Sequence, residues 1–176
     1  MTKYIFPNGD TLEMKAIKRA AFQSEETHCY EAKLYLNGKP FAIVSNDGHG
    51  GADYQYPAGD HTNADITAID ERCKNEMPKY VSSFAPEGMS VDLELWCALG
   101  VDDWLMRKDM KTSMKSKVLV SDPKRPGSVF EIKFKGCRKI TDRQLFVIAS
   151  EKPDYKILNR MSEDDAFAIY KAAANT

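Results

Sequence analysis

The pair Asn37-Gly38, with an apolar segment on each side, is the local feature that most constrains the fold. Both residue types tolerate positive φ, and Asn-Gly is the preferred pair for a two-residue type I′ turn. Residues 29–36 and 41–45 are therefore predicted to form an antiparallel hairpin with one buried face. In the register of a two-residue turn, the facing pairs are Leu36 with Lys39, Leu34 with Phe41, and Ala32 with Ile43.

Further strands and helices are predicted on both sides of this hairpin. Residues 3–6 and 11–15 read as two strands joined by a Pro-Asn-Gly-Asp turn, which extends the hairpin into an N-terminal antiparallel β-meander. Thr62 and Asp65 form a capping box ahead of a helical apolar stripe that ends at Pro78. A second helix starts near Ser90, and we expect Gly100 to break or bend it.

The last third returns to strands before it ends in helices. Residues 117–121 and 128–135 flank a Pro/Gly turn and predict a second β-hairpin. Capping signals at Thr141 and Ser162 open two C-terminal helices. The sequence thus predicts one α+β domain over residues 1–176, with an N-terminal antiparallel β-meander, a helical middle, a second β-hairpin and two C-terminal helices.

Composition excludes several classes of protein. The 176 residues carry a net charge of -1, so non-specific attraction of the whole molecule to nucleic acid or membrane is not expected. The apolar runs are far shorter than the roughly 20 residues of a spanning helix, and the charged start predicts no secretory signal. The four cysteines contain no C-x-x-C, which excludes a zinc ribbon and a thioredoxin-like motif. We expect four free thiols in a reducing compartment.

Charge is segregated along the chain. Residues 47–103 hold 12 acidic and 3 basic residues, whereas residues 104–139 hold 11 basic and 3 acidic residues. The acidic and basic blocks could face each other, or each could be a solvated surface. Alternatively, one of the two blocks binds a partner. The basic block would bind a nucleic-acid backbone or an acidic protein, and the acidic block would occupy a basic groove by imitating phosphates. The candidate basic binding residues, which helix-dipole complementarity also explains, are Arg107, Lys108, Lys111 and Lys115.

The segment 46–61 contains three glycines within four positions, two of the three histidines and several carboxylates. It fits a phosphate cradle of glycine amides, a metal site, an acid–base site around His49, or a plain connecting loop. The metal candidates are Asp47, His49, Asp53 and His61, but their spacing matches no known metal motif. We expect binding without metal or cofactor. The candidate binding residues of this segment are Asp47, Gly48, His49, Gly50, Gly51, Asp53 and Tyr54.

Catalytic signatures are absent from the sequence. It has no G-x-S-x-G, no H-E-x-x-H and no EF-hand loop. No catalytic residue is therefore assigned, and we favour a protein that is not an enzyme.

Residues 35–39 and the segment Asn46-Asp47-Gly48-His49-Gly50-Gly51 resemble a loose group of small, mostly uncharacterised proteins of phages and mobile elements. The resemblance is vaguer around residues 157–162. It implies a cytoplasmic protein of a bacterial host cell, and small phage proteins of this kind often inhibit host defence, as anti-CRISPR proteins do. The leading hypothesis is therefore a binding protein that inhibits a host defence complex, a protein or ribonucleoprotein, by surface contact. The alternatives are an enzyme that acts on a nucleotide or phosphate compound through the Gly-rich loop 46–54, and a nucleic-acid-binding accessory protein that uses the basic block 104–139.

Overall fold

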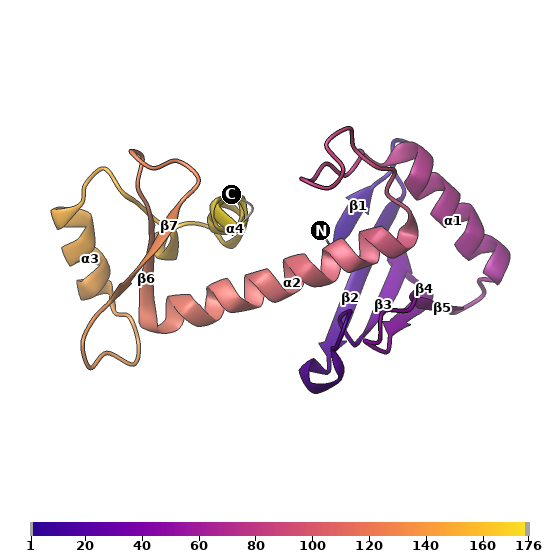
Figure 1. Cartoon of the computed structure of the whole chain (residues 1–176), viewed down its shortest axis with the longest axis horizontal. Coiled ribbons are helices and arrows are strands. Elements are labelled where there is room, and N and C mark those ends of the chain that lie inside the picture. Colours follow the sequence, from indigo (N-terminus) through magenta and orange to yellow (C-terminus); the bar gives the residue numbers. More distant parts are fainter. Residues whose placement is uncertain (1, 175–176) are drawn as a thin grey trace. The chain divides into compact units, whose positions relative to one another are not determined.

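The computed structural model describes residues 2–174, and its packing divides the chain into two compact units. Residues 1–104 form unit 1 and residues 105–176 form unit 2, with the boundary inside the helix α2 (Leu93–Ser116). Sheets and helices occur in separate runs, so the fold class is α+β, as predicted (Figure 1). The single-domain prediction for residues 1–176 stays a prediction.

Unit 1 is built on a five-stranded antiparallel sheet whose strand order follows the chain. The predicted meander is therefore confirmed. One face of the sheet is buried, with Leu12, Ala32, Leu34 and Val44 all inaccessible to solvent. The strands are β1 (Lys3–Ile5), β2 (Thr11–Arg19), β3 (Tyr30–Leu36), β4 (Lys39–Asn46) and β5 (Tyr54–Pro57).

The β3–β4 hairpin turns at Asn37-Gly38, where both residues have positive φ, 52° and 78°. Leu36 faces Lys39, as the two-residue turn requires. The register holds through Tyr35 with Pro40, but beyond Pro40 the prediction is wrong, because a β-bulge at Phe41 shifts the register by one residue. The facing pairs are Leu34 with Ala42 and Ala32 with Val44, whereas Ile43 points to the outer face.

Helix α1 (Asn63–Glu76) begins where its capping signal predicts, whereas α2 begins at Leu93, three residues after the predicted start near Ser90. In α1 the capping box between Thr62 and Asp65 is formed, and Cys73 lies on the buried side. The helix α2 begins after Asp92, whose side chain accepts a hydrogen bond from Leu95 N. The predicted break at Gly100 is wrong, because α2 continues through this buried residue. A short 3₁₀ turn, η1 (Ala21–Gln23), precedes β3.

Unit 2 consists of a three-stranded sheet and its helices. The predicted second hairpin is formed by β6 (Lys117–Ser121) and β7 (Val129–Lys133), and the short β8 (Lys156–Ile157) adds a third strand that the sequence did not indicate. The predicted C-terminal helices are α3 (Asp142–Glu151) and α4 (Glu163–Ala174), with the 3₁₀ turn η2 (Leu158–Arg160) between them. Met110 of α2 packs in one core cluster with Leu119 and Phe167.

Two further expectations from the sequence concern the cysteines and membrane-spanning helices. All four cysteines are free thiols. Among the described helices, none combines the length and the apolar character needed to cross a bilayer.

Candidate functional site

The Gly-rich segment after β4 is organised by the buried side chain of Asn46. Its Oδ1 accepts hydrogen bonds from Thr27 Oγ1 at 2.7 Å and from Gly48 N at 2.8 Å. Its Nδ2 donates to Gly51 O at 2.9 Å and to Asp53 Oδ1 at 3.0 Å. One amide therefore fixes both ends of the loop and ties it to the segment that precedes β3.

Close approach of the backbone requires a glycine at position 48, and positive φ favours glycine at both 48 and 50. A Cβ on Gly48 would lie 2.2 Å from the carbonyl oxygen of Gln23, and one on Gly50 would lie 2.1 Å from a carboxylate oxygen of Glu26. Both residues also have positive φ. Gly51 has open space at its Cβ position and no such φ. The glycines thus allow the loop to fold against residues 23–29.

Three successive backbone amides of this loop already donate hydrogen bonds within the protein. Gly48 N donates to Asn46 Oδ1 at 2.8 Å, His49 N to Asp47 Oδ1 at 3.1 Å, and Gly50 N to Thr27 Oγ1 at 3.4 Å. Because an anion cradle needs free amide groups that point at the ligand, this conformation does not favour the phosphate cradle considered from the sequence.

A pocket of about 320 Å³ opens beside the loop in unit 1. Its wall comes from three parts of the chain: the segment before β3, the Gly-rich loop and the first turns of α2. The acidic side chains in the wall are Glu26, Asp53, Glu94 and Asp102, and the remaining lining residues are Thr27, His28, Tyr30, Asn46, Gly51 and Ala98. Four of the ten lining residues carry a carboxylate, which gives the pocket a negative potential.

Asp53 is the most buried of these carboxylates. It accepts a hydrogen bond from the Tyr30 hydroxyl and another from Asn46 Nδ2. Burial raises the pKa of Asp53 above its ordinary value, against the lowering effect of these two hydrogen bonds. Burial, together with the Cys97 thiol and the Asp53 carboxylate, also raises the pKa of Tyr30. The phenol is therefore a hydrogen-bond donor at physiological pH.

Glu94 continues the acidic wall. Its Oε1 accepts a hydrogen bond from Asp53 N at 3.3 Å. Burial and the nearby charges of Asp53 and Asp92 raise the pKa of Glu94. Two turns further along α2, Asp102 Oδ1 lies 2.9 Å from His28 Nε2. Because nearby carboxylates raise the pKa of Glu94, a cation at this wall would relieve their repulsion, so the pocket is suited to an ammonium or guanidinium group.

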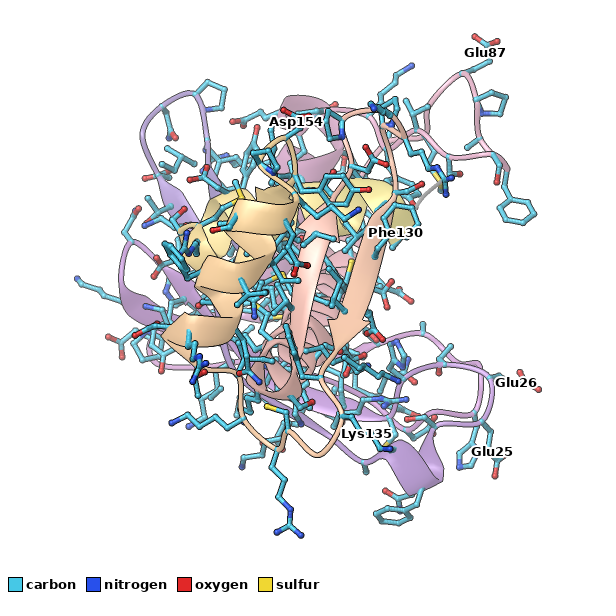
Figure 2. The ribbon with its side chains drawn as sticks, turned by 90° about the vertical axis from the view of Figure 1, so that its left-hand side faces the viewer. Glu25, Glu26, Glu87, Phe130, Lys135 and Asp154 are labelled. Atoms are coloured by element: carbon cyan, nitrogen blue, oxygen red, sulfur yellow. The ribbon has the colours of Figure 1, made fainter. Side chains whose placement is uncertain are left out.

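The histidines and carboxylates proposed as metal ligands are not brought together. His49 Nδ1 lies 3.2 Å from Glu25 Oε2, whereas the ring of His61 packs edge-on against Phe41 with centroids 5.0 Å apart. Figure 2 labels Glu25 and Glu26, whose carboxylates project from the segment before β3. Within residues 2–174, no group of three or more His, Cys, Asp or Glu side chains is arranged to hold a metal ion.

The remaining candidates from the sequence lie outside this pocket. Asp47 is exposed at the loop surface, and Tyr54 is exposed on the outer face of β5. In unit 2, Arg107 lies over the ring of Phe167 at 4.0 Å from its centroid and 2.9 Å from Asp164 Oδ1.

The other basic candidates differ in how they are used. Lys111 forms a 2.6 Å ion pair with Glu163, so Lys111 and Arg107 both contact α4. Lys108 and Lys115 are exposed. Two of the four basic candidates therefore serve packing within unit 2.

Most of the pocket residues escaped sequence reasoning. From the sequence, Tyr30 reads as an ordinary strand residue and Glu26 as part of a polar break over residues 24–27. Asn46 opens the Gly-rich segment but is not among its candidate binding residues. One signal was present in the sequence of α2. Glu94, Ala98 and Asp102 recur every fourth residue, which places two carboxylates on one helix face with a small residue between them.

Comparison with protein-family models, with curated proteins and with solved structures finds no match for this chain.

Proposed function

We propose that this chain is a binding protein that acts by surface contact, and that the acidic pocket of unit 1 receives a basic side chain of the partner. The observation that carries the proposal is the pocket of about 320 Å³ with four carboxylates in its wall. A guanidinium or ammonium group in that pocket would be surrounded by charge-assisted acceptors.

The charge of the whole unit supports a basic partner. Residues 1–104 contain 17 acidic and 9 basic residues, a net charge of -8, in a molecule whose total charge is only -1. A potential of this sign steers a positively charged surface towards the unit and repels phosphate groups. It therefore favours binding of a basic groove over chemistry on a nucleotide.

The class of partner that we propose is a host protein or ribonucleoprotein complex with a basic nucleic-acid-binding groove. The resemblance of residues 46–51 to proteins of phages and mobile elements supports a host defence complex as the target. The acidic unit would occupy the groove in place of nucleic-acid phosphates.

The pocket is tested with a defined basic probe. Isothermal titration of the full chain with a hexa-arginine peptide is expected to show binding that weakens as salt is added, and a hexa-citrulline peptide of the same shape is expected not to bind. Glu94→Gln should weaken arginine-peptide binding by about threefold to tenfold, because it removes one charge from the pocket.

Asp60→Asn is the matched control, since it removes the same charge from an exposed position of unit 1 outside the pocket. It should leave the affinity nearly unchanged. Equal losses in the two variants would show that the peptide senses only net charge, and would remove the pocket from the proposal.

The mode of action is tested separately in a host defence assay. A contact inhibitor should act at equimolar amounts with its target complex and leave the covalent mass of every target subunit unchanged. Inhibition at substoichiometric amounts, with a modified product seen by mass spectrometry, would instead establish an enzyme.

A further inference from the structure

The loop between β7 and α3 of unit 2 gathers exposed cations that the pocket of unit 1 does not explain. Figure 2 labels Phe130 near the start of β7 and Lys135 beyond its end. The basic loop cluster, as we call it, consists of five exposed residues: Lys115, Lys135, Arg138, Lys139 and Arg143.

Backbone hydrogen bonds bring these residues into one neighbourhood. Cys137 N donates to Phe134 O at 3.0 Å and closes a turn in which Gly136 has a φ of 74°. Ile140 N then donates to Lys115 O at 2.8 Å, which fixes the end of the loop to the end of α2. Figure 1 shows this loop beside the C-terminal end of α2. Lys115 is therefore a neighbour of Lys139, although 24 positions separate them in sequence.

These five cations are not used inside the fold. In the described part of the chain, none of them lies within ion-pair distance of a carboxylate, in contrast to Arg107, Lys111 and Lys117 of the same unit. Unit 2 contains 16 basic and 9 acidic residues, a net charge of +7. Because charges beyond about 10 Å are largely screened at 0.1 M salt, this local field matters more for binding than the near-zero total.

An exposed aromatic ring accompanies the cations. Phe146 of α3 is 65% exposed and follows Arg143 by three positions, so both side chains lie on the same side of the helix. A nucleic-acid strand uses both features, because its phosphates contact the cations and its unstacked bases stack on an aromatic ring.

We propose that the basic loop cluster and Phe146 form a binding site for single-stranded nucleic acid, with the five cations on the phosphates and Phe146 against a base. The site lies in unit 2 and shares no residue with the acidic pocket. Its failure would therefore leave the proposed function intact.

The test uses fluorescence anisotropy of the full chain with a labelled oligothymidylate of about 12 nucleotides, within the range of single-strand sites. Affinity should fall with salt, with a log–log slope of about -0.7 for each phosphate contacted. The double variant Lys135→Glu, Lys139→Glu should lower the affinity by more than about tenfold and make the slope shallower by about 1.4.

The matched control is the double variant Lys124→Glu, Arg125→Glu. These exposed residues lie in the turn at the other end of the hairpin, and the change in net charge is the same. The control should retain most of the affinity. Circular dichroism melting of both variants verifies that they are folded.

Three results would overturn the proposal. In the first, the control variant loses as much affinity as the loop variant. In the second, Phe146→Ala binds as well as the wild type. In the third, a polyglutamate peptide of matched charge competes as well as the oligonucleotide. The last result would identify the cluster as a site for an acidic protein surface. The stacking contact predicts that Phe146→Ala weakens binding by about fivefold to tenfold.

Discussion

The buried side chain of Asn46 joins three segments of unit 1 through four hydrogen bonds. Its partners are Thr27, Gly48, Gly51 and Asp53. Removal of one partner from a buried polar network leaves the others unsatisfied and costs more than the bond itself contributes. The acidic pocket therefore depends on a neutral residue that carries none of its charge.

Asn46→Ala tests this dependence. We expect a loss of about 2–4 kcal/mol in the free energy of unfolding, because the variant leaves buried donors and acceptors without partners. His49→Ala, in the same loop but exposed, should change stability by no more than about 0.5 kcal/mol. Urea denaturation of both variants measures the difference, and similar values for the two would contradict the role assigned to Asn46.

The ionised carboxylate of Glu94 lowers the stability of the free protein at neutral pH. Its folded-state pKa is raised, so the native protein binds more protons than the unfolded chain in the pH window just above the ordinary carboxylate pKa. The stability contributed by this group is therefore lost as pH rises through that window. The charge that we assign to partner binding destabilises the free protein at neutral pH.

Glu94→Gln should consequently raise the melting temperature at pH 7 while it weakens binding of the arginine peptide. The gain should shrink towards a pH of about 4, where the wild-type carboxyl is itself protonated. Melting curves recorded by circular dichroism across this range check the sign. A variant that melts below the wild type at pH 7 would show that the carboxylate stabilises the fold.

At the level of elements, the β-bulge in β4 decides which side chains enter the core of unit 1. Phe41 and Ala42 are both buried although they are consecutive, and Ile43 is 37% exposed. Strict alternation would have placed Phe41 and Ile43 on one face. The bulge follows Pro40, which lacks a backbone donor for the ladder.

Two alanine variants distinguish the observed register from simple alternation. Phe41→Ala should cost about 3–5 kcal/mol, since it removes a fully buried aromatic ring. Ile43→Ala should cost less than about 1 kcal/mol, because its side chain is partly in water on the outer face. Equilibrium unfolding in urea provides the comparison, and a larger loss for Ile43→Ala would contradict the bulge.

For the whole molecule, the near-zero charge conceals two units of opposite sign, -8 and +7. At low ionic strength, and near the pI of about 6.3, copies of the chain should attract one another through these opposite charges. Added salt shortens the Debye length and should reverse the attraction.

Light scattering near the pI measures this effect through the second virial coefficient. The coefficient should be negative at about 10 mM salt and become less negative at about 150 mM. Self-association that instead strengthens with salt would indicate apolar contacts between copies.

Local sequence signals determined the hairpin turn, the starts of α1 and α3, and the charge division of this protein. Asn37-Gly38 defines its turn because both residues accept positive φ, and the capping boxes at Thr62 and Thr141 satisfy amides within three residues of the cap. The charge division needed only counting: the boundary between the acidic and basic blocks lies within one residue of the boundary between the units.

Only the tertiary structure decided the bulge at Phe41, the passage of α2 through Gly100 and the acidic pocket. A glycine costs a helix about 1 kcal/mol, and packing of the flanking turns outweighs this local preference. The pocket joins residues as far apart as Glu26 and Asp102, and Asn46 rather than any charged motif shapes its wall. Local propensities act over a few residues, whereas this site exists only after β3, β4 and α2 have packed together, because its hydrogen bonds and charge repulsions join segments distant in sequence.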